Sequence, residues 1–152
     1  MRKTIYGLFG LLTLAAALPL ATAQDKPAAA AGGGTVKVKV HYTGSGTVDD
    51  KHKIMVFLFD TPAFSQGTAI PFASQGATSK KDVVTFTDVA KSPAYVAIVF
   101  DPTGKYDGMS APPSGASLGM YSSKPPTPSP VNVKPGKTVT VAVDFDDMQK
   151  MP

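Results

Sequence analysis

The segment from Asp101 to Gly108 carries oxygen-bearing side chains at alternate positions, as in a calcium-binding loop. Asp101, Thr103 and Asp107 can each offer an oxygen to a hard cation, and the following glycine lets the chain turn sharply. Lys105 stands where another oxygen is needed, and the chain has no glutamate that could close the loop as a bidentate ligand. We therefore expect these aspartates mainly to cap turns, and we keep Asp101 and Asp107 as the candidate metal ligands.

The two histidines and a nearby methionine are the second candidates for metal chemistry. Imidazole and thioether groups suit copper. If consecutive strands are neighbours, His41 and His52 approach each other, and Met55 is close to His52 in the sequence. Met55 lies within an apolar run, however, which favours a place in the core. We therefore assign no copper site.

Catalysis has little support in the sequence. The chain has no cysteine, and neither histidine has a recognisable serine or aspartate arrangement around it. Asp49 and Asp50, like Asp146 and Asp147, are adjacent, so in an extended chain their side chains point to opposite faces and cannot form a shared acid–base site. We expect these residues to be solvated strand ends. The protein is expected not to be an enzyme and to need no cofactor.

Large apolar side chains in two long loops are the best candidates for a binding surface. The loops span 61–79 and 101–130 and are rich in glycine and proline, so they should lie at the surface, where binding residues concentrate. The alternative is that these side chains fold back to cover the ends of the fold, because loops of this length need their own packing. The candidate interaction residues are Phe64, Phe72, Tyr106, Met109, Met120 and Tyr121.

Alternation of apolar and polar residues predicts the strands that hold these loops. The clearest strand is 35–43, where Lys37 and Lys39 lie on the polar face and resemble the charges that protect a sheet edge. The continuous apolar run HKIMVFLFD fits a strand that is buried on both faces or lies in the centre of a sandwich. Further strands are predicted over 81–89, 94–100 and 138–145.

The remaining composition favours strands and turns over helices. All eleven acidic residues are aspartate, which suits turns and strand ends better than helices. The loop 101–130 is dense in glycine, proline and serine, so it predicts extended backbone and no core element. Short strands with turn residues between them predict an all-β fold, an antiparallel β-sandwich of about seven strands.

The first 23 residues have the pattern of a secretory signal peptide. Arg2 and Lys3 precede an apolar run, and small residues at 21–23 suit cleavage. We therefore expect a secreted or periplasmic protein with no membrane segment once the signal is removed. Without Arg2 and Lys3 the formal net charge falls from +4 to +2, since 13 basic residues remain against 11 acidic ones. This charge is too mild to indicate nucleic-acid binding.

The chain after the signal peptide divides into three parts. Residues 24–34 form an Ala/Gly-rich spacer with nothing to bury, 35–147 form one sandwich domain, and 148–152 form a tail. The absence of cysteine excludes disulfides, so packing alone must stabilise this domain.

Two segments resemble the prealbumin-like (transthyretin-like) and carboxypeptidase-regulatory-like sandwiches of exported bacterial proteins. In those domains a phrase of the type F-x-D-V, small loop, Y-x-V-x-V links two core strands, and VVTFTDVAKSPAYVAIVFD is similar to it. VNVKPGKTVTVAVDF is the second matching segment. The phrase is carried here by Phe86, Asp88, Val89, Tyr95, Ala97 and Val99. The resemblance implies an Ig-like or transthyretin-like sandwich with an accessory, adhesive or assembly role, and it carries over no ligand.

Taken together, these patterns predict a non-catalytic exported module. We expect it to interact with a protein or a cell-envelope component through loops 61–79 and 101–130. The alternative is binding of a carbohydrate or a metal ion at the same loop end. A structural part in a larger assembly, formed through an exposed sheet edge, is a third hypothesis.

Overall fold

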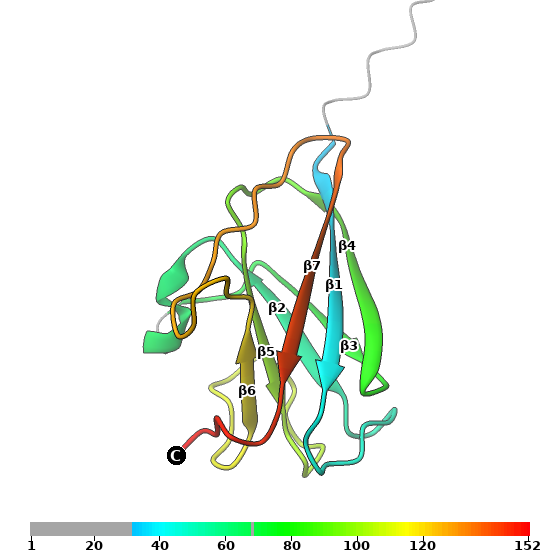
Figure 1. Ribbon diagram of the computed structural model, residues 1–152, viewed down its shortest axis with the longest axis vertical. Helices are drawn as coiled ribbons and strands as arrows, with labels where there is room; N and C mark the ends of the chain where they lie inside the picture. Colours follow the sequence, from blue (N-terminus) through cyan, green and yellow to red (C-terminus); the bar gives the residue numbers. More distant parts are fainter. Residues whose placement is uncertain (1–31, 68) are drawn as a thin grey trace, which may run out of the picture.

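Seven β-strands and one short 3-10 helix follow one another along residues 32–67 and 69–152, which the computed structural model describes (Figure 1). The predicted signal peptide and residues 24–31 of the predicted spacer lie outside the described residues. The prediction of an all-β fold is confirmed. The elements are β1 (Gly34–Tyr42), β2 (Ile54–Phe59), η1 (Pro62–Gln66), β3 (Ala73–Ala77), β4 (Lys81–Val89), β5 (Tyr95–Phe100), β6 (Ser117–Met120) and β7 (Thr138–Phe145).

The strands form two sheets, one of three strands in the order β4–β1–β7 and one of four in the order β3–β2–β5–β6. Neighbouring strands are antiparallel except β1 and β7, which run parallel with Val36 opposite Val139 and Val40 opposite Val143 (Figure 1). The expectation of a wholly antiparallel sandwich is therefore wrong for this pair. The chain between β1 and β7 passes through the entire four-stranded sheet, so it can return to β1 in the same direction.

The core between the sheets comes from the alternation along each strand. Val36, Val38 and Val40 of β1 point inward and are at most 2% exposed. They meet the inward side chains of β5, including Ile98 and Phe100, in one buried cluster. Because successive side chains of a strand point to opposite faces, the intervening residues of β1 must face away from this core.

The position of β1 corrects two expectations from the sequence. β1 lies between β4 and β7, in the middle of its sheet, so Lys37 and Lys39 do not protect an edge. β2 belongs to the other sheet, so His41 and His52 do not lie on neighbouring strands. Both errors come from assuming that strands adjacent in sequence pair with each other.

Two strands occur inside segments that the sequence predicts as loops. β3 lies within 61–79, and β6 lies within 101–130, where no core element was expected. β6 is a true part of the fold, because Ser117 is 1% exposed and Ala116 is fully buried. Neither strand contains a β-branched residue, so pairing with β2 and β5 overrides local propensity.

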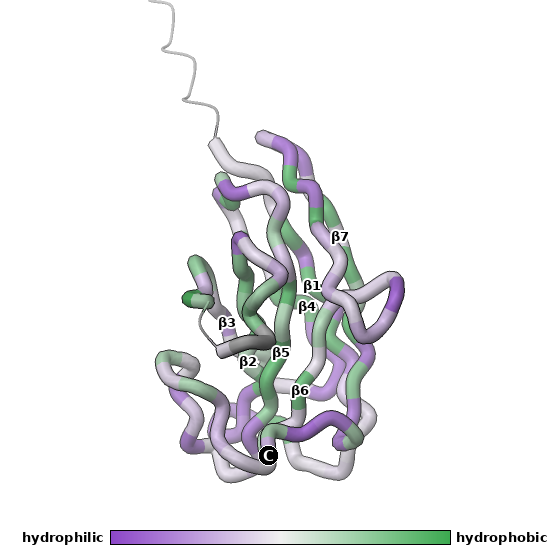
Figure 2. The backbone as a smooth tube through the Cα atoms, turned by 90° about the vertical axis from the view of Figure 1, so that its left-hand side faces the viewer, coloured by the Kyte–Doolittle hydropathy of each residue, from purple (hydrophilic) through white to green (hydrophobic). Residues whose placement is uncertain are grey.

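The outer face of the four-stranded sheet is apolar and is covered by loops. Phe57 and Phe59 of β2 point outward and are buried in a second apolar cluster. Because the inward side chains are apolar as well, β2 is hydrophobic along its length (Figure 2). The Phe64 ring of η1 stacks on Phe59 with a centroid distance of 5.0 Å, and the Tyr106 ring packs edge-on against Phe57 at 6.2 Å. The prediction that this apolar run is a strand buried on both faces is confirmed.

The C-terminal segment continues the pairing at the open edge of β6. The Gln149 carbonyl accepts a hydrogen bond from the Leu118 amide, and the Met151 amide donates to the Ala116 carbonyl. Met151 also packs on the outer apolar cluster of the four-stranded sheet. Residues 148–152, predicted as a tail, therefore cover an edge and an apolar face. Among the described residues, no helix is long and apolar enough to cross a membrane.

Candidate functional site

Among the described residues, the outer face of the three-stranded sheet is open to solvent, because its side chains are exposed or half-buried. The period of two along β1 places three of its polar side chains on this face, and the register of β4 and β7 places three residues on each side of them. We call this surface the lysine face. It consists of Lys37, Lys39 and His41 of β1, Lys81, Val83 and Thr85 of β4, and Thr140, Ala142 and Asp144 of β7.

Positive charge dominates the lysine face. Lys37, Lys39 and Lys81 are exposed, and none of them forms an ion pair within the part of the chain that the structure describes. The one carboxylate on the face, that of Asp144, lies 2.9 Å from Nδ1 of His41. The lysine ammonium groups therefore remain available to an external anion.

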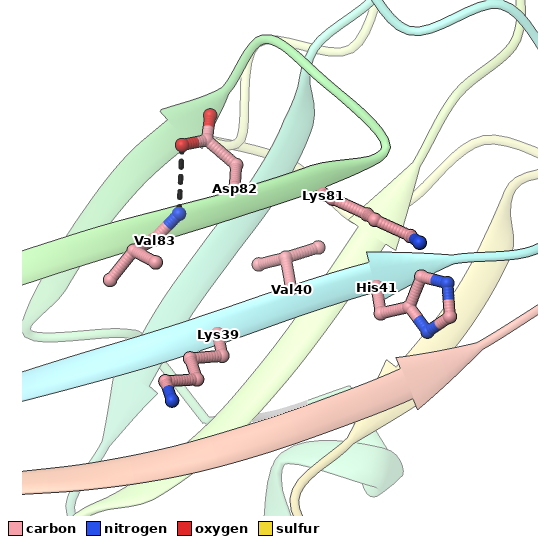
Figure 3. A pocket seen from close by; sticks show the side chains of 6 residues that line it. All are labelled: Lys39, Val40, His41, Lys81, Asp82 and Val83. Atoms are coloured by element: carbon pink, nitrogen blue, oxygen red, sulfur yellow. Dashed lines mark hydrogen bonds between the residues drawn. The ribbon is translucent and has the colours of Figure 1, made fainter.

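A shallow depression lies at the end of β1 on this face (Figure 3). It is lined by Lys39, Val40, His41, Lys81 and Val83. Asp82 also borders it, but its carboxylate accepts hydrogen bonds from the Val83 amide at 2.8 Å and the Thr78 amide at 3.1 Å. Asp82 is thereby held toward the β3–β4 turn. The lining offers the lysine cations to a ligand.

Asp101, one of the two predicted metal ligands, organises its own loop. It is 4% exposed, and it accepts hydrogen bonds from the amides of Thr103, Lys105 and Tyr106 and from the Thr103 hydroxyl, at 2.8 to 3.0 Å. Burial raises the pKa of Asp101, but these four hydrogen bonds outweigh it and hold the pKa below its ordinary value. Three of the donors bond to Oδ2 and one to Oδ1, so of about four lone-pair sites only one, on Oδ1, remains for a cation.

Asp107, the other predicted ligand, is exposed and accepts a hydrogen bond from the Met109 amide at 2.9 Å. Within residues 32–67 and 69–152, no group of three histidine or aspartate side chains is placed to hold a metal ion. His41 and His52 each bond to a different aspartate, Asp144 and Asp49. Metal binding by Asp101 and Asp107 therefore stays a prediction, and the geometry of these residues does not favour it.

The predicted interaction residues are mostly packed against the protein itself. Phe64 and Tyr106 cover the four-stranded sheet, as described above. This arrangement agrees with the alternative that the loop side chains fold back onto the protein. Phe72 and Tyr121 pack against the core between the sheets, and Met120 is half-buried in β6. Met109, 88% exposed, is the one of the six that projects into solvent.

The two long loops leave the four-stranded sheet at opposite ends. The first follows Phe59 and the second follows Phe100, and Phe100 pairs with Ile54 at the far end of β2. Each loop also contains a strand, β3 or β6, so residues 60–72 and the residues after Met120 lie at the same end of the sheet, near Phe59. The expectation of a ligand site at a shared loop end stays a prediction.

Asp147 is the polar residue whose role the sequence did not reveal. Its carboxylate accepts hydrogen bonds from the Tyr42 hydroxyl at 2.5 Å, from the Ser117 hydroxyl at 2.7 Å, and from the Ser45 amide and hydroxyl at 2.8 and 2.9 Å. The Tyr42 hydrogen bond, followed by those of Ser45 and Ser117, holds the pKa of Asp147 well below its ordinary range. Asp147 thus joins three segments of the chain through hydrogen bonds and is not a solvated strand end.

The sequence indicates that Tyr42 needs a hydrogen-bond partner, but it does not indicate which residue that is. Tyr42 ends the alternating apolar face of the first strand, so its hydroxyl had to emerge at the end of the core and find a partner. Burial raises the pKa of Tyr42, and the hydrogen bond to Asp147 raises it further. Nothing in the spacing of 105 residues could identify Asp147 as that partner.

Comparison of the chain with protein-family models, curated proteins and solved structures finds no match. The resemblance to transthyretin-like sandwiches therefore stays a prediction. Only the sequence and the geometry of this chain therefore support a function.

Proposed function

We propose that this chain is an exported, non-catalytic binding module that attaches to an anionic polymer of the cell envelope through the lysine face. The observation that supports this is the contrast between the two outer faces of the sandwich. The four-stranded sheet is covered by η1, the loop around Tyr106 and the C-terminal segment. The outer face of the three-stranded sheet is exposed, and within residues 32–67 and 69–152 its three lysines form no ion pair. In this proposal the sandwich is of the Ig-like or transthyretin-like kind, and its two long loops stabilise it.

The magnitude of surface electrostatics favours a polymer over a small ion. An exposed ion pair contributes at most about 1 kcal/mol, because water and salt screen it. Lys37, Lys39 and Lys81 act independently on a small anion, so none of them alone holds it firmly. A polymer that meets all three at once gains from their effective concentration. Positive charge gathered on one face also speeds the encounter.

Direct binding tests this proposal. The protein is residues 24–152, which contain every element of the described fold. The probes are alginate, a linear polymer of uronic acids, long-chain polyphosphate, and neutral dextran. We expect alginate to bind, dextran not to bind, and the affinity for alginate to fall as salt is raised.

A matched pair of variants locates the site. The first replaces Lys37, Lys39 and Lys81 by glutamine, and the control replaces Lys105, Lys124 and Lys150, which are exposed elsewhere, and so changes the net charge equally. We expect about tenfold weaker binding for the first and a change below about threefold for the control. Equal losses in both variants, or wild-type protein that binds no anionic polymer, would overturn the proposal. Thermal unfolding of each variant confirms that it is folded.

A further inference from the structure

We infer that the polymer is an acidic glycan, a polysaccharide whose sugar units carry carboxylate groups; this inference rests on the proposed function. The lysine face is built in three cross-strand rows with different chemistry. Each row places one residue of β1 between one residue of β4 and one of β7, with about 5 Å between neighbouring strands.

The first row surrounds an ammonium group with hydroxyls. Lys37 lies between Thr85 of β4 and Thr140 of β7. Lys37 and Thr140 are exposed and Thr85 is half-buried, so all three reach solvent. A hydroxyl both donates and accepts hydrogen bonds, and it therefore suits sugar hydroxyls on either side of a carboxylate bound to Lys37.

The second row offers an apolar patch beside a cation. Lys39 lies between Val83 and Ala142, and Val83 is 51% exposed. The C–H groups of a sugar ring can pack on this patch while a carboxylate reaches Lys39. Lys37 and Lys39 are two residues apart along β1, about 7 Å, and their long flexible stems let both reach charges on one chain.

The third row limits the charge of the ligand. His41 lies between Lys81 and Asp144, and Asp144 uses Oδ1 to bond to His41. Asp144 is 75% exposed, so it repels an anion and can accept from a neutral hydroxyl. A polyanion that has no neutral hydroxyl groups fits this row poorly. A glycan with hydroxyls between its carboxylates fits it well.

Two other anionic polymers fit this face less well. Polyphosphate has neither apolar groups for Val83 and Ala142 nor hydroxyls for the threonines. Single-stranded nucleic acid binds mainly by stacking bases on aromatic side chains. The lysine face contains no phenylalanine, tyrosine or tryptophan.

The deciding experiment removes hydroxyls and leaves the charge unchanged. The double variant Thr85→Val, Thr140→Val is compared with a control double variant, Thr47→Val, Thr127→Val, at exposed positions outside the face. Binding of alginate and of polyphosphate is measured calorimetrically for each. We expect the first variant to bind alginate about fivefold to tenfold more weakly, with polyphosphate binding and the control unchanged within about twofold.

The outcomes separate this inference from the proposed function. If the triple lysine variant loses alginate but the Thr85→Val, Thr140→Val variant keeps it, the glycan inference is wrong and the anion-binding face stands. Equal loss of alginate and polyphosphate in the threonine variant also overturns the glycan inference. If the wild-type protein binds neither polymer, both fail.

Discussion

The Tyr42 hydroxyl donates a 2.5 Å hydrogen bond to the Asp147 carboxylate, across 105 residues of sequence. The same carboxylate accepts hydrogen bonds from Ser45 and Ser117. It therefore connects the end of β1, the start of β6 and the chain that follows β7. One charged group joins both sheets at this end of the sandwich.

We expect Tyr42→Phe to lower the free energy of unfolding by about 1–2 kcal/mol, the value of a hydrogen bond to a charged group with partial exposure. The ring itself stays in place against Phe100 and Phe145, at centroid distances of 4.8 and 4.9 Å. Urea unfolding followed by circular dichroism measures the change. The control is Tyr106→Phe, whose hydroxyl donates to the Ser110 carbonyl at an exposed site. Equal losses in the two variants would contradict the role of Asp147.

Acid should destabilise the protein partly through Asp147. Its pKa in the folded state is lowered, first by the Tyr42 hydrogen bond, so the stability it contributes is full above the unfolded-state pKa of about 4 and is lost as the pH falls below it. Asp147→Asn should therefore be less stable than wild type at neutral pH and should lose less stability between about pH 5 and pH 2. The exposed Asp50→Asn variant serves as the control and should follow the wild-type curve. Parallel curves for Asp147→Asn and wild type would refute the prediction.

The loop that follows β2 offers a matched pair for testing the covered face. Phe64 stacks on Phe59, whereas Ile70 is 84% exposed. Phe64→Ala should cost about 2–3 kcal/mol of unfolding free energy, less than a fully buried ring because Phe64 is only partly buried. Ile70→Ala should change the stability by less than about 0.5 kcal/mol. Chemical denaturation measures the unfolding free energy of both variants. A loss in Ile70→Ala as large as in Phe64→Ala would mean that η1 does not stabilise the protein by covering the sheet.

The loop after β5 should depend on Asp101 far more than on Asp107. Asp101→Asn replaces an acceptor of three backbone amides with a side chain that carries its own donors. We expect limited proteolysis to cut this loop at least about fivefold faster, while Asp107→Asn, which affects one exposed amide contact, changes little. Calcium added to the wild type should leave the unfolding midpoint unchanged. A calcium-dependent rise that Asp101→Asn abolishes would restore the metal site.

The strands that the sequence predicts are those whose own side chains carry the pattern. β1, β4 and β7 alternate valine, phenylalanine or tyrosine with polar residues, and the apolar runs of β2 and β5 are long enough to show burial on both faces. β3 and β6, with the sequences ASQGA and SLGM, carry no such pattern. They are strands because β2 and β5 offer them hydrogen-bonding edges, which only the tertiary structure supplies.

The candidate site was visible in the sequence as residues but not as a surface. The polar side of β1 was predicted correctly, including Lys37 and Lys39. Whether these lysines mark an edge or the middle of a face depends on the two partners of β1. β4 lies near the middle of the domain sequence and β7 lies at its end. The cross-strand rows, and Asp144 beside His41, follow from a register across 103 residues that no local pattern encodes.

The central position of β1 also determines when the domain can fold. β1 is the first strand to leave the ribosome, yet neither of its neighbours is made until later, and β7 comes last. Closing so long a loop is entropically costly and slow, so the nascent chain has no stable three-stranded sheet until synthesis is nearly complete. The three-stranded sheet therefore closes late, and we expect the domain to fold as one cooperative event that follows synthesis.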